Sequence, residues 1–159
     1  MTDVWHIADD LHERVTTGRD FARLFAGKKL GNGITRWVFE NKQDPTCVLK
    51  FEVGSGDMFQ NVIEWKVWEA VRADRSLRRW FAPCVAISEN GLVLIQKKVE
   101  PVGNRVRLKK VPDFLTDVKD ANWGVYKGRL VCHDYGLMPL WYLLDKGKRM
   151  RRSHWKPET

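Results

Sequence analysis

The chain has 159 residues, of which 43% are hydrophobic and 30% are charged, so it is long enough for one domain with a sizeable core. No apolar run approaches the ~20 residues that a membrane-spanning helix needs, which excludes a helical membrane protein. The formal net charge is +8, and residues 146–159 supply +5 of it. Basic character is therefore concentrated in a short C-terminal segment.

This basic segment has two interpretations. Its six Lys and Arg residues, with Trp155 among them, could contact nucleic acid weakly or bind an acidic partner. Alternatively it is a solvated, partly disordered end.

The cysteines and the N-terminus predict a compartment. Cys47, Cys84 and Cys132 are odd in number, well separated and set in apolar or strand-like runs, so we expect reduced and largely buried thiols. Residues 1–4 have no positive n-region or apolar h-region of a secretory signal. The sequence thus predicts a cytoplasmic protein without membrane contact.

The first half of the chain predicts three strands after a helical segment. Residues 3–26 carry apolar side chains at helical spacing, interrupted near Gly18. Strands are expected at about 28–32, 35–40 and 46–53, with a polar hairpin turn at residues 41–45.

A helix and a hairpin follow. Residues 59–73 have helical spacing, and the arginines after them are expected to form a solvated helix end. Strands are predicted at 84–88 and 92–98 because Asn90-Gly91 is a strong hairpin signal between two apolar runs. The chain therefore predicts an α+β fold with five antiparallel strands and one inserted helix.

The most informative motif lies near the C-terminus. Asp117, Lys119 and Asn122 are followed, twelve residues after Asn122, by Asp134-Tyr135-Gly136. Phosphoryl transfer needs this grouping, in which one carboxylate orients the attacking hydroxyl and a lysine neutralises the moving phosphate. An amide and a second carboxylate supply the hard oxygen ligands that Mg²⁺ prefers.

This run resembles the catalytic loop and metal-binding motif of the protein-kinase superfamily, and the upstream residues extend the resemblance. Residues 30–39, with Gly31 and Gly33, resemble a glycine-rich phosphate loop in which Arg36 stands at the third glycine position. Lys50 resembles the ATP-binding lysine of the third strand, and Glu64 the helix glutamate that pairs with it. Together they cover roughly residues 28–136.

The resemblance implies a role for each of these residues. Gly31, Gly33, Lys50 and Glu64 would serve nucleotide binding, and Asn122 and Asp134 would hold Mg²⁺. Asp117 and Lys119 would act on the transferred phosphate. Two alternatives stay open, namely that Lys50 is an edge-strand lysine and Glu64 an exposed helix residue. Gly31 and Gly33 could merely close a hairpin, and Asp117 could be an exposed loop residue.

The chain also departs from the family. The interval between Gly103 and Asp117 is too short for the two helices that a full kinase has there, and 23 residues follow Gly136. We therefore expect a helical extension at 1–27 and a kinase-like small lobe at 28–100. A hinge at 99–103 would lead into a much reduced catalytic lobe within 101–145, followed by a basic tail at 146–159.

The predicted function is that of a minimal kinase-like protein, which binds Mg–ATP and phosphorylates a Ser or Thr hydroxyl of a protein. The alternative is a non-catalytic binding module on the same scaffold, whose apolar residues Leu137, Leu140, Trp141 and Leu143 would contact a partner or a second copy. Such compact chains resemble bacteriophage proteins, which would place this one in a host cytoplasm.

Overall fold

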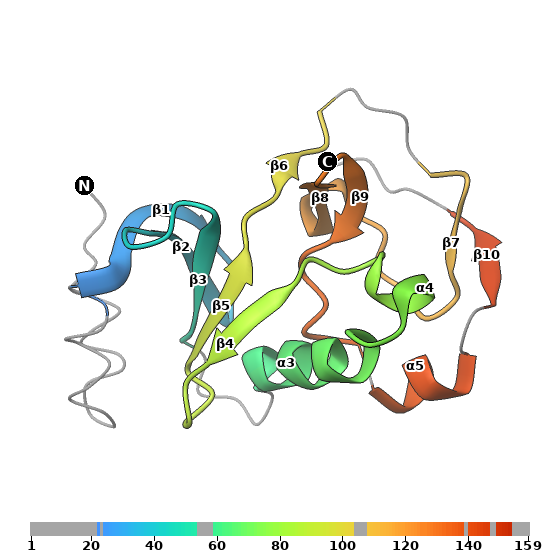
Figure 1. Cartoon of the computed structure of the whole chain (residues 1–159), viewed down its shortest axis with the longest axis horizontal. Helices are drawn as coiled ribbons and strands as arrows, with labels where there is room; N and C mark the ends of the chain where they lie inside the picture. Colours follow the sequence, from blue (N-terminus) through green and yellow to red (C-terminus); the bar gives the residue numbers. More distant parts are fainter. Residues whose placement is uncertain are drawn as a thin grey trace. The chain divides into compact units, whose positions relative to one another are not determined.

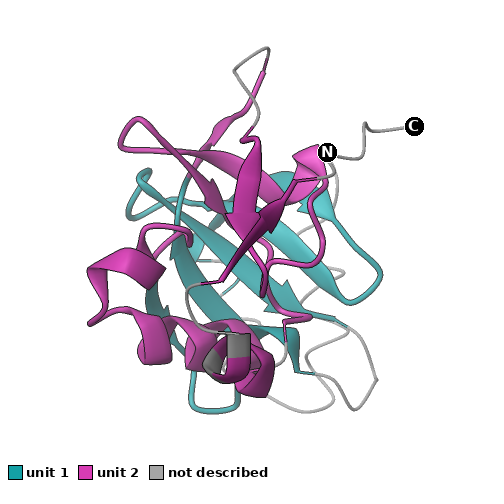
Figure 2. Ribbon diagram, turned by 90° about the vertical axis from the view of Figure 1, so that its right-hand side faces the viewer, with its two compact units in different colours: residues 1–61, 84–98 teal, residues 62–83, 99–159 magenta. Residues whose placement is uncertain are grey.

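A computed structural model describes residues 22, 24–53, 59–103, 108–138, 140–146 and 149–153, apart from the side chains of 144 and 146. The chain divides into two compact units. Unit 1 comprises residues 1–61 and 84–98, and unit 2 comprises residues 62–83 and 99–159 (Figure 2). Most of the helical segment predicted at 3–26 lies outside the described residues.

Unit 1 is built on a five-stranded antiparallel sheet (Figure 1). Its strands are β1 (Ala26–Asn32), β2 (Arg36–Asn41), β3 (Cys47–Glu52), β4 (Cys84–Ile87) and β5 (Val93–Lys97), in the order β1-β2-β3-β5-β4. All six residues of β3 are buried, as expected for the central strand of a sheet. The five predicted strands are thereby confirmed, and their ends differ by at most two residues.

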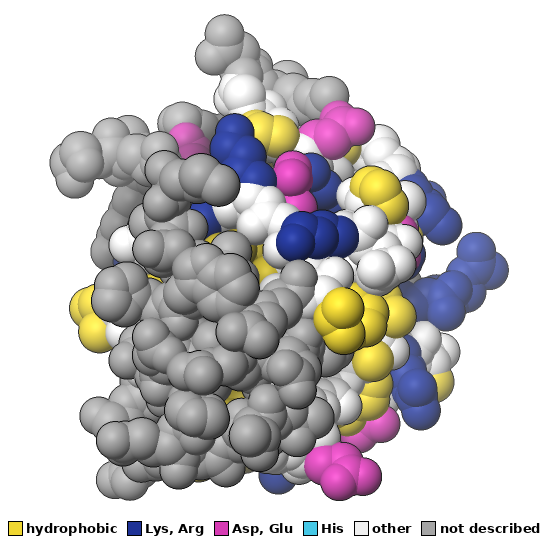
Figure 3. Space-filling model, turned by 90° about the vertical axis from the view of Figure 1, so that its left-hand side faces the viewer, with side chains coloured by type: hydrophobic (Ala, Val, Ile, Leu, Met, Phe, Trp, Pro, Cys, Tyr) yellow, Lys and Arg dark blue, Asp and Glu magenta, His cyan; other side chains and the backbone are white. Residues whose placement is uncertain are grey.

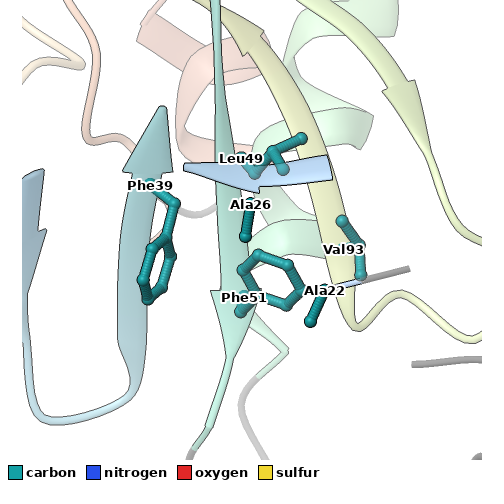
Figure 4. Close-up of a cluster of buried hydrophobic side chains, with 6 residues drawn as sticks. All are labelled: Ala22, Ala26, Phe39, Leu49, Phe51 and Val93. Atoms are coloured by element: carbon teal, nitrogen blue, oxygen red, sulfur yellow. The ribbon is translucent and has the colours of Figure 1, made fainter. Parts of the chain in front are cut away.

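A cluster of apolar side chains from β1, β2, β3 and β5 forms the core of unit 1 (Figure 4). Phe39 and Phe51 meet edge to face with ring centroids 5.6 Å apart. Burying each such side chain contributes roughly 1.5–3 kcal/mol. Ala26 of β1 and Ala22 before it belong to the same cluster, so Ala22 packs on the sheet.

Two turns in unit 1 follow their predicted chemistry. Oδ1 of Asn41 accepts a hydrogen bond from the backbone N–H of Gln43 over 2.9 Å in the β2–β3 turn. In the β4–β5 turn Gly91 has φ +74°, a conformation that glycine adopts without strain. This confirms the Asn90-Gly91 hairpin.

Unit 2 contains most of α3 (Gln60–Val71) together with α4 (Arg75–Arg78), a 3₁₀ turn η1 (Asp120–Asn122) and α5 (Leu140–Lys146). Strands β6 (Glu100–Pro101), β8 (Trp123–Tyr126) and β9 (Arg129–Cys132) form a three-stranded sheet, and β7 (Lys110–Pro112) pairs with β10 (Met150–Arg152). The expected hinge residues thus include a strand, since Glu100 pairs with Val125.

The structure corrects two further expectations. The segment 146–159 is not wholly a solvated tail, because β10 pairs with β7 in register. Leu143 is only 2% exposed and so cannot belong to a partner surface, whereas Leu137 and Trp141 are 61% and 67% exposed. The C-terminal apolar run therefore divides between core and surface.

Three further observations concern the cysteines, the arginines after α3 and the helices. Cys47, Cys84 and Cys132 are all buried and form no disulfide among the described residues. The arginines after α3 are exposed, in agreement with a solvated helix end. No helix in the described part is both long enough and apolar enough to span a membrane.

Candidate phosphoryl-transfer site

Gly31 lies near the end of β1, and Gly33 lies in the turn between β1 and β2. Gly31 pairs with Val38 in the β1–β2 ladder, and the N–H of Gly33 donates to the carbonyl of Arg36 over 2.7 Å. A Cβ atom at position 31 would meet nothing within 4 Å, and one at 33 would come no closer than 3.6 Å to the Arg36 carbonyl. The described structure therefore does not itself require glycine at either position.

Lys50 lies at the centre of the unit 1 sheet. It is only 3% exposed and pairs with Val38 on one side and Leu94 on the other. The interpretation of Lys50 as an edge-strand lysine is therefore wrong. A buried ammonium group is costly unless it is compensated, so this position is unusual for a lysine without a role.

Asn61, which the sequence did not single out, supports the strand of Lys50. Its Nδ2 donates to the carbonyls of Lys50 at 3.0 Å and Leu92 at 3.1 Å. Its backbone N–H donates to Oε2 of Glu52 at 2.9 Å. Asn61 is thus fixed to the second half of β3 and to the residue before β5, all within unit 1. A buried Asn at a helix start gives only a weak sequence signal.

Glu64, in unit 2, is fully buried, so its interpretation as an exposed helix residue is wrong. Its Oε1 accepts a hydrogen bond from the backbone N–H of Tyr135 over 3.0 Å. Tyr135 is itself buried, packs against Phe81 with ring centroids 4.9 Å apart, and donates through its hydroxyl to the carbonyl of Ala82 at 2.8 Å. The residue after Asp134 is therefore held from both its backbone and its side chain.

The residues of the predicted catalytic loop come together. Oδ2 of Asp117 lies 3.0 Å from Nδ2 of Asn122 and 3.1 Å from Nζ of Lys119. Asp117 and Lys119 are about half exposed, so their ion pair contributes little to stability. Asp117 is an exposed loop residue, as the alternative interpretation of the sequence expected. Its carboxylate is also the shared partner of Lys119 and Asn122.

A hairpin explains why Asp134 follows Asn122 at this spacing. Strands β8 and β9 pair antiparallel, and Lys127 and Gly128 form their two-residue turn with φ of 48° and 76°. Positive φ at both positions is typical of a type I′ hairpin turn. The chain returns to its start, where the N–H of His133 donates to the carbonyl of Asn122 over 2.8 Å.

The hairpin was not among the predicted elements. Its signal was present as a Lys-Gly pair between the apolar runs Trp123–Tyr126 and Leu130–Cys132. Asp134 then extends from the end of β9 as an exposed residue, and the thiol of Cys132 donates to its backbone carbonyl at 3.3 Å. Asn122 and Asp134 therefore flank the two ends of one hairpin.

Asn122 and Asp134 offer one amide oxygen and one carboxylate to a cation. With Nδ2 of Asn122 donating to Asp117, Oδ1 is the atom that the amide presents to a metal ion. The described residues contain no group of three or more His, Cys, Asp or Glu that could hold a metal. Mg²⁺ does not need such a group, because it keeps several waters and commonly binds one or two carboxylates plus phosphate oxygens. The donor set fits Mg²⁺.

The sequence-predicted residues are thus distributed over both units. Unit 1 holds Gly31, Gly33 and Lys50, while unit 2 holds Glu64 and the residues of the catalytic loop and hairpin. A cavity of about 350 Å³ in unit 2 involves none of them. It is lined by Arg79, Trp80, Leu108, Val125, Gly128, Arg129 and Leu130.

Comparison with protein-family models gave no match, and neither did comparison with curated proteins.

Proposed function

We propose that this protein binds Mg–ATP and transfers its γ-phosphoryl group to a Ser or Thr hydroxyl of a protein. The observation that carries the proposal is the position of the Asp117 carboxylate, which contacts both Lys119 and Asn122 on the loop that the β8–β9 hairpin joins to Asp134. Phosphoryl transfer depends on positioning and on charge stabilisation, and these residue types supply both.

Each residue of unit 2 has a distinct part in the proposed reaction. Asn122 and Asp134 would hold Mg²⁺, which neutralises charge on the phosphate oxygens. Asp117 would orient the acceptor hydroxyl and accept its proton as the hydroxyl oxygen bonds to the γ-phosphorus. The bond from that phosphorus to the β–γ bridging oxygen breaks, and ADP leaves with the bond's electron pair. Lys119 would stabilise the charge on the moving phosphoryl group.

The residues of unit 1 would bind the phosphates. The open space beside Gly31 would allow phosphate oxygen atoms to approach the backbone where β1 enters its turn to β2. Lys50 would supply a positive charge to the α- and β-phosphates. The buried central position of Lys50 supports this role more than a surface position would.

Mg–ATP binding is the first test. A ligand at 100 times its dissociation constant adds about 2.7 kcal/mol to the free energy of unfolding, which thermal shift detects readily. We expect Lys50→Ala and Asp134→Asn each to abolish the shift. Lys66→Ala on the exposed face of α3 and Glu89→Gln in the β4–β5 turn are the matched controls and should retain it. A shift that survives in both site variants would contradict the proposed site.

Transfer is the second test. The wild-type protein and Asp117→Asn are incubated with ATP labelled at the γ-phosphate and a mixture of Ser- and Thr-containing proteins. Labelled protein should form with the wild type and fall by about 10²-fold or more with the variant, since general-base catalysis contributes about that much. If ATP binds but no labelled protein forms, catalysis is excluded and only the nucleotide-binding part of the proposal is retained.

A non-catalytic binding module remains the second candidate, because Leu137 and Trp141 are large apolar residues exposed beside the Asp134 segment and on α5. If this candidate is correct, the biological effect survives Asp134→Asn and is lost in a Leu137→Ser, Trp141→Ser double variant. The catalytic proposal instead requires that the effect is lost in Asp134→Asn and survives in the double variant.

Nucleic-acid binding has less support. Arg151 of the basic segment is engaged within unit 2, where it bonds to the carbonyl of Leu115. On the face shown in Figure 3, the described Lys and Arg side chains lie among acidic and apolar ones and form no continuous stripe. Replacing the other basic residues of the segment by Ala should leave any affinity for nucleic acid unchanged; these are Lys146, Lys148, Arg149, Arg152 and Lys156. A contact made by the segment would instead be lost, and it would be strongly salt-dependent in the wild type.

A further inference from the structure

Strand β7, which pairs with the C-terminal strand β10, leads into the loop that carries Asp117. Arg151 pairs with Val111 in the β7–β10 ladder. The pairing extends past both strands, because the N–H of Asp113 donates to the carbonyl of Arg149 at 2.8 Å and that of Ser153 to Lys109 at 3.0 Å. Strand β7 and the turn after it are therefore fixed to the C-terminal segment.

The side chain of Arg151 reaches beyond the ladder. Its Nη2 donates to the carbonyl of Leu115 over 2.6 Å and contacts that of Thr116 at 3.4 Å. Its Nε lies 3.8 Å from Oδ1 of Asp113, and both side chains are mostly buried. One guanidinium group thus spans residues 113–116, which directly precede Asp117.

This arrangement suits arginine specifically. The planar guanidinium places Nη2 against the two carbonyls and Nε toward the Asp113 carboxylate, so one rigid group faces all three acceptors. A lysine carries the same charge at a single point and cannot reproduce that geometry. Backbone carbonyls held in this way fix the direction in which the chain leaves the turn, and hence the position of the Asp117 backbone.

We propose that Arg151 is a positioning residue for the Asp117 loop, held in place by the C-terminal strand. The catalytic consequence depends on the proposed phosphotransferase function, whereas the effect on the loop does not. Arg151 does not touch the reacting atoms. It acts by keeping the Asp117 carboxylate where it meets Lys119 and Asn122.

Hydrogen exchange on the full chain tests the structural part. The backbone N–H groups of Leu115 and Asn122, which bond to Pro112 and Lys119, report on the loop. In Arg151→Met we expect both to exchange about tenfold faster, while amides of β2 and β3 keep their wild-type rates. The control is Arg152→Met, because Arg152 is the exposed neighbour on the same strand. Equal exchange in the two variants would overturn the proposal.

The charge-preserving variant Arg151→Lys separates the fork from the charge, and it also serves if Arg151→Met does not fold. It should still show faster exchange at Leu115 than Arg152→Met does. Wild-type protection in Arg151→Lys would mean that a point charge suffices, which would overturn the role of the fork.

Kinetics then test the catalytic part. Arg151→Lys should lower kcat for phosphoryl transfer about tenfold and leave KM for ATP within about twofold, because positioning losses appear in the chemical step. A change in KM alone would contradict positioning. If the wild type transfers no phosphate, the proposed function fails, and the exchange comparison still decides whether Arg151 holds the loop.

Discussion

The backbone N–H of Tyr135 donates a hydrogen bond to Oε1 of Glu64 over 3.0 Å, and both residues are buried. This bond joins the second turn of α3 to the segment that carries Asp134, 71 residues later in the chain. A buried N–H donor that loses its hydrogen-bond acceptor is costly. The position of the Asp134 backbone therefore depends on Glu64.

Replacing Glu64 by Ala should lower the free energy of unfolding by about 1–3 kcal/mol, because the buried N–H of Tyr135 loses its acceptor. Urea denaturation measures this. Glu69→Ala is the matched control on the same helix, where Glu69 is exposed and its nearest ion-pair distance is 3.9 Å to Arg72. We expect the control to change stability by less than about 0.5 kcal/mol. Equal effects of the two substitutions would contradict a special role for Glu64.

Two glycines give opposite predictions. Gly31→Ala should leave the free energy of unfolding unchanged or slightly raised, since a Cβ there meets nothing within 4 Å, yet it should weaken Mg–ATP binding. Gly124→Ala should destabilise by about 1–3 kcal/mol, because a Cβ there would clash with Val99 and lie 2.9 Å from the carbonyl of Glu100. For both variants, urea denaturation measures the effect on the free energy of unfolding, and calorimetry measures the effect on ATP affinity. Unchanged ATP affinity in Gly31→Ala would remove the phosphate-loop assignment.

Local sequence signals predicted the strands and turns of unit 1, because neighbouring residues determine these elements. Alternating and apolar runs identified the five strands of unit 1, and Asn90-Gly91 identified a turn that requires positive φ. The sequence predicted that Asp117, Lys119 and Asn122 lie together, because they fall within six residues, and the structure brings them into contact. The burial of Glu64 and Lys50 could be settled only by the three-dimensional packing.

The C-terminal segment shows why the remainder could not be predicted. Met150–Arg152 is short and basic, and it forms a strand only because β7 offers a partner. Met150 pairs with Pro112, which lies 38 residues earlier in the chain. Pairings that are distant in sequence leave no local periodicity. Arg151 therefore looked like part of a charged tail, whereas its guanidinium is bonded to carbonyls of the loop before Asp117.

Asn61, the last residue of the first segment of unit 1, offers a test of how the strand of Lys50 is held within that unit. Its Nδ2 bonds the carbonyls of Lys50 and Leu92, and it is fully buried. Asn61→Ala should reduce the free energy of unfolding by about 1–3 kcal/mol through the loss of these buried donors. Lys66→Ala, on the exposed side of the same helix, is the control and should change stability by less than about 0.5 kcal/mol. Chemical denaturation that fails to separate the two would show that these bonds do not stabilise the unit.

The β2–β3 turn predicts a dependence of stability on pH. Asp44 accepts hydrogen bonds from the Thr46 hydroxyl at 2.6 Å, the Cys47 thiol at 3.0 Å and the Thr46 N–H at 2.9 Å. These bonds, led by the Thr46 hydroxyl and aided by nearby Lys97, hold the pKa of the Asp44 carboxyl well below its usual range. All of them favour the ionised form of the carboxyl.

Because the folded pKa is depressed, Asp44 stabilises the fold above its unfolded pKa of about 3.9, and this contribution is lost as the pH falls toward the folded pKa. The free energy of unfolding should therefore fall between about pH 5 and pH 2 more steeply in the wild type than in Asp44→Asn. Urea denaturation at several pH values measures the difference. Glu89→Gln, in the exposed β4–β5 turn, should follow the wild-type curve. Parallel curves for the wild type and Asp44→Asn would show that the carboxylate of Asp44 is not the group that titrates.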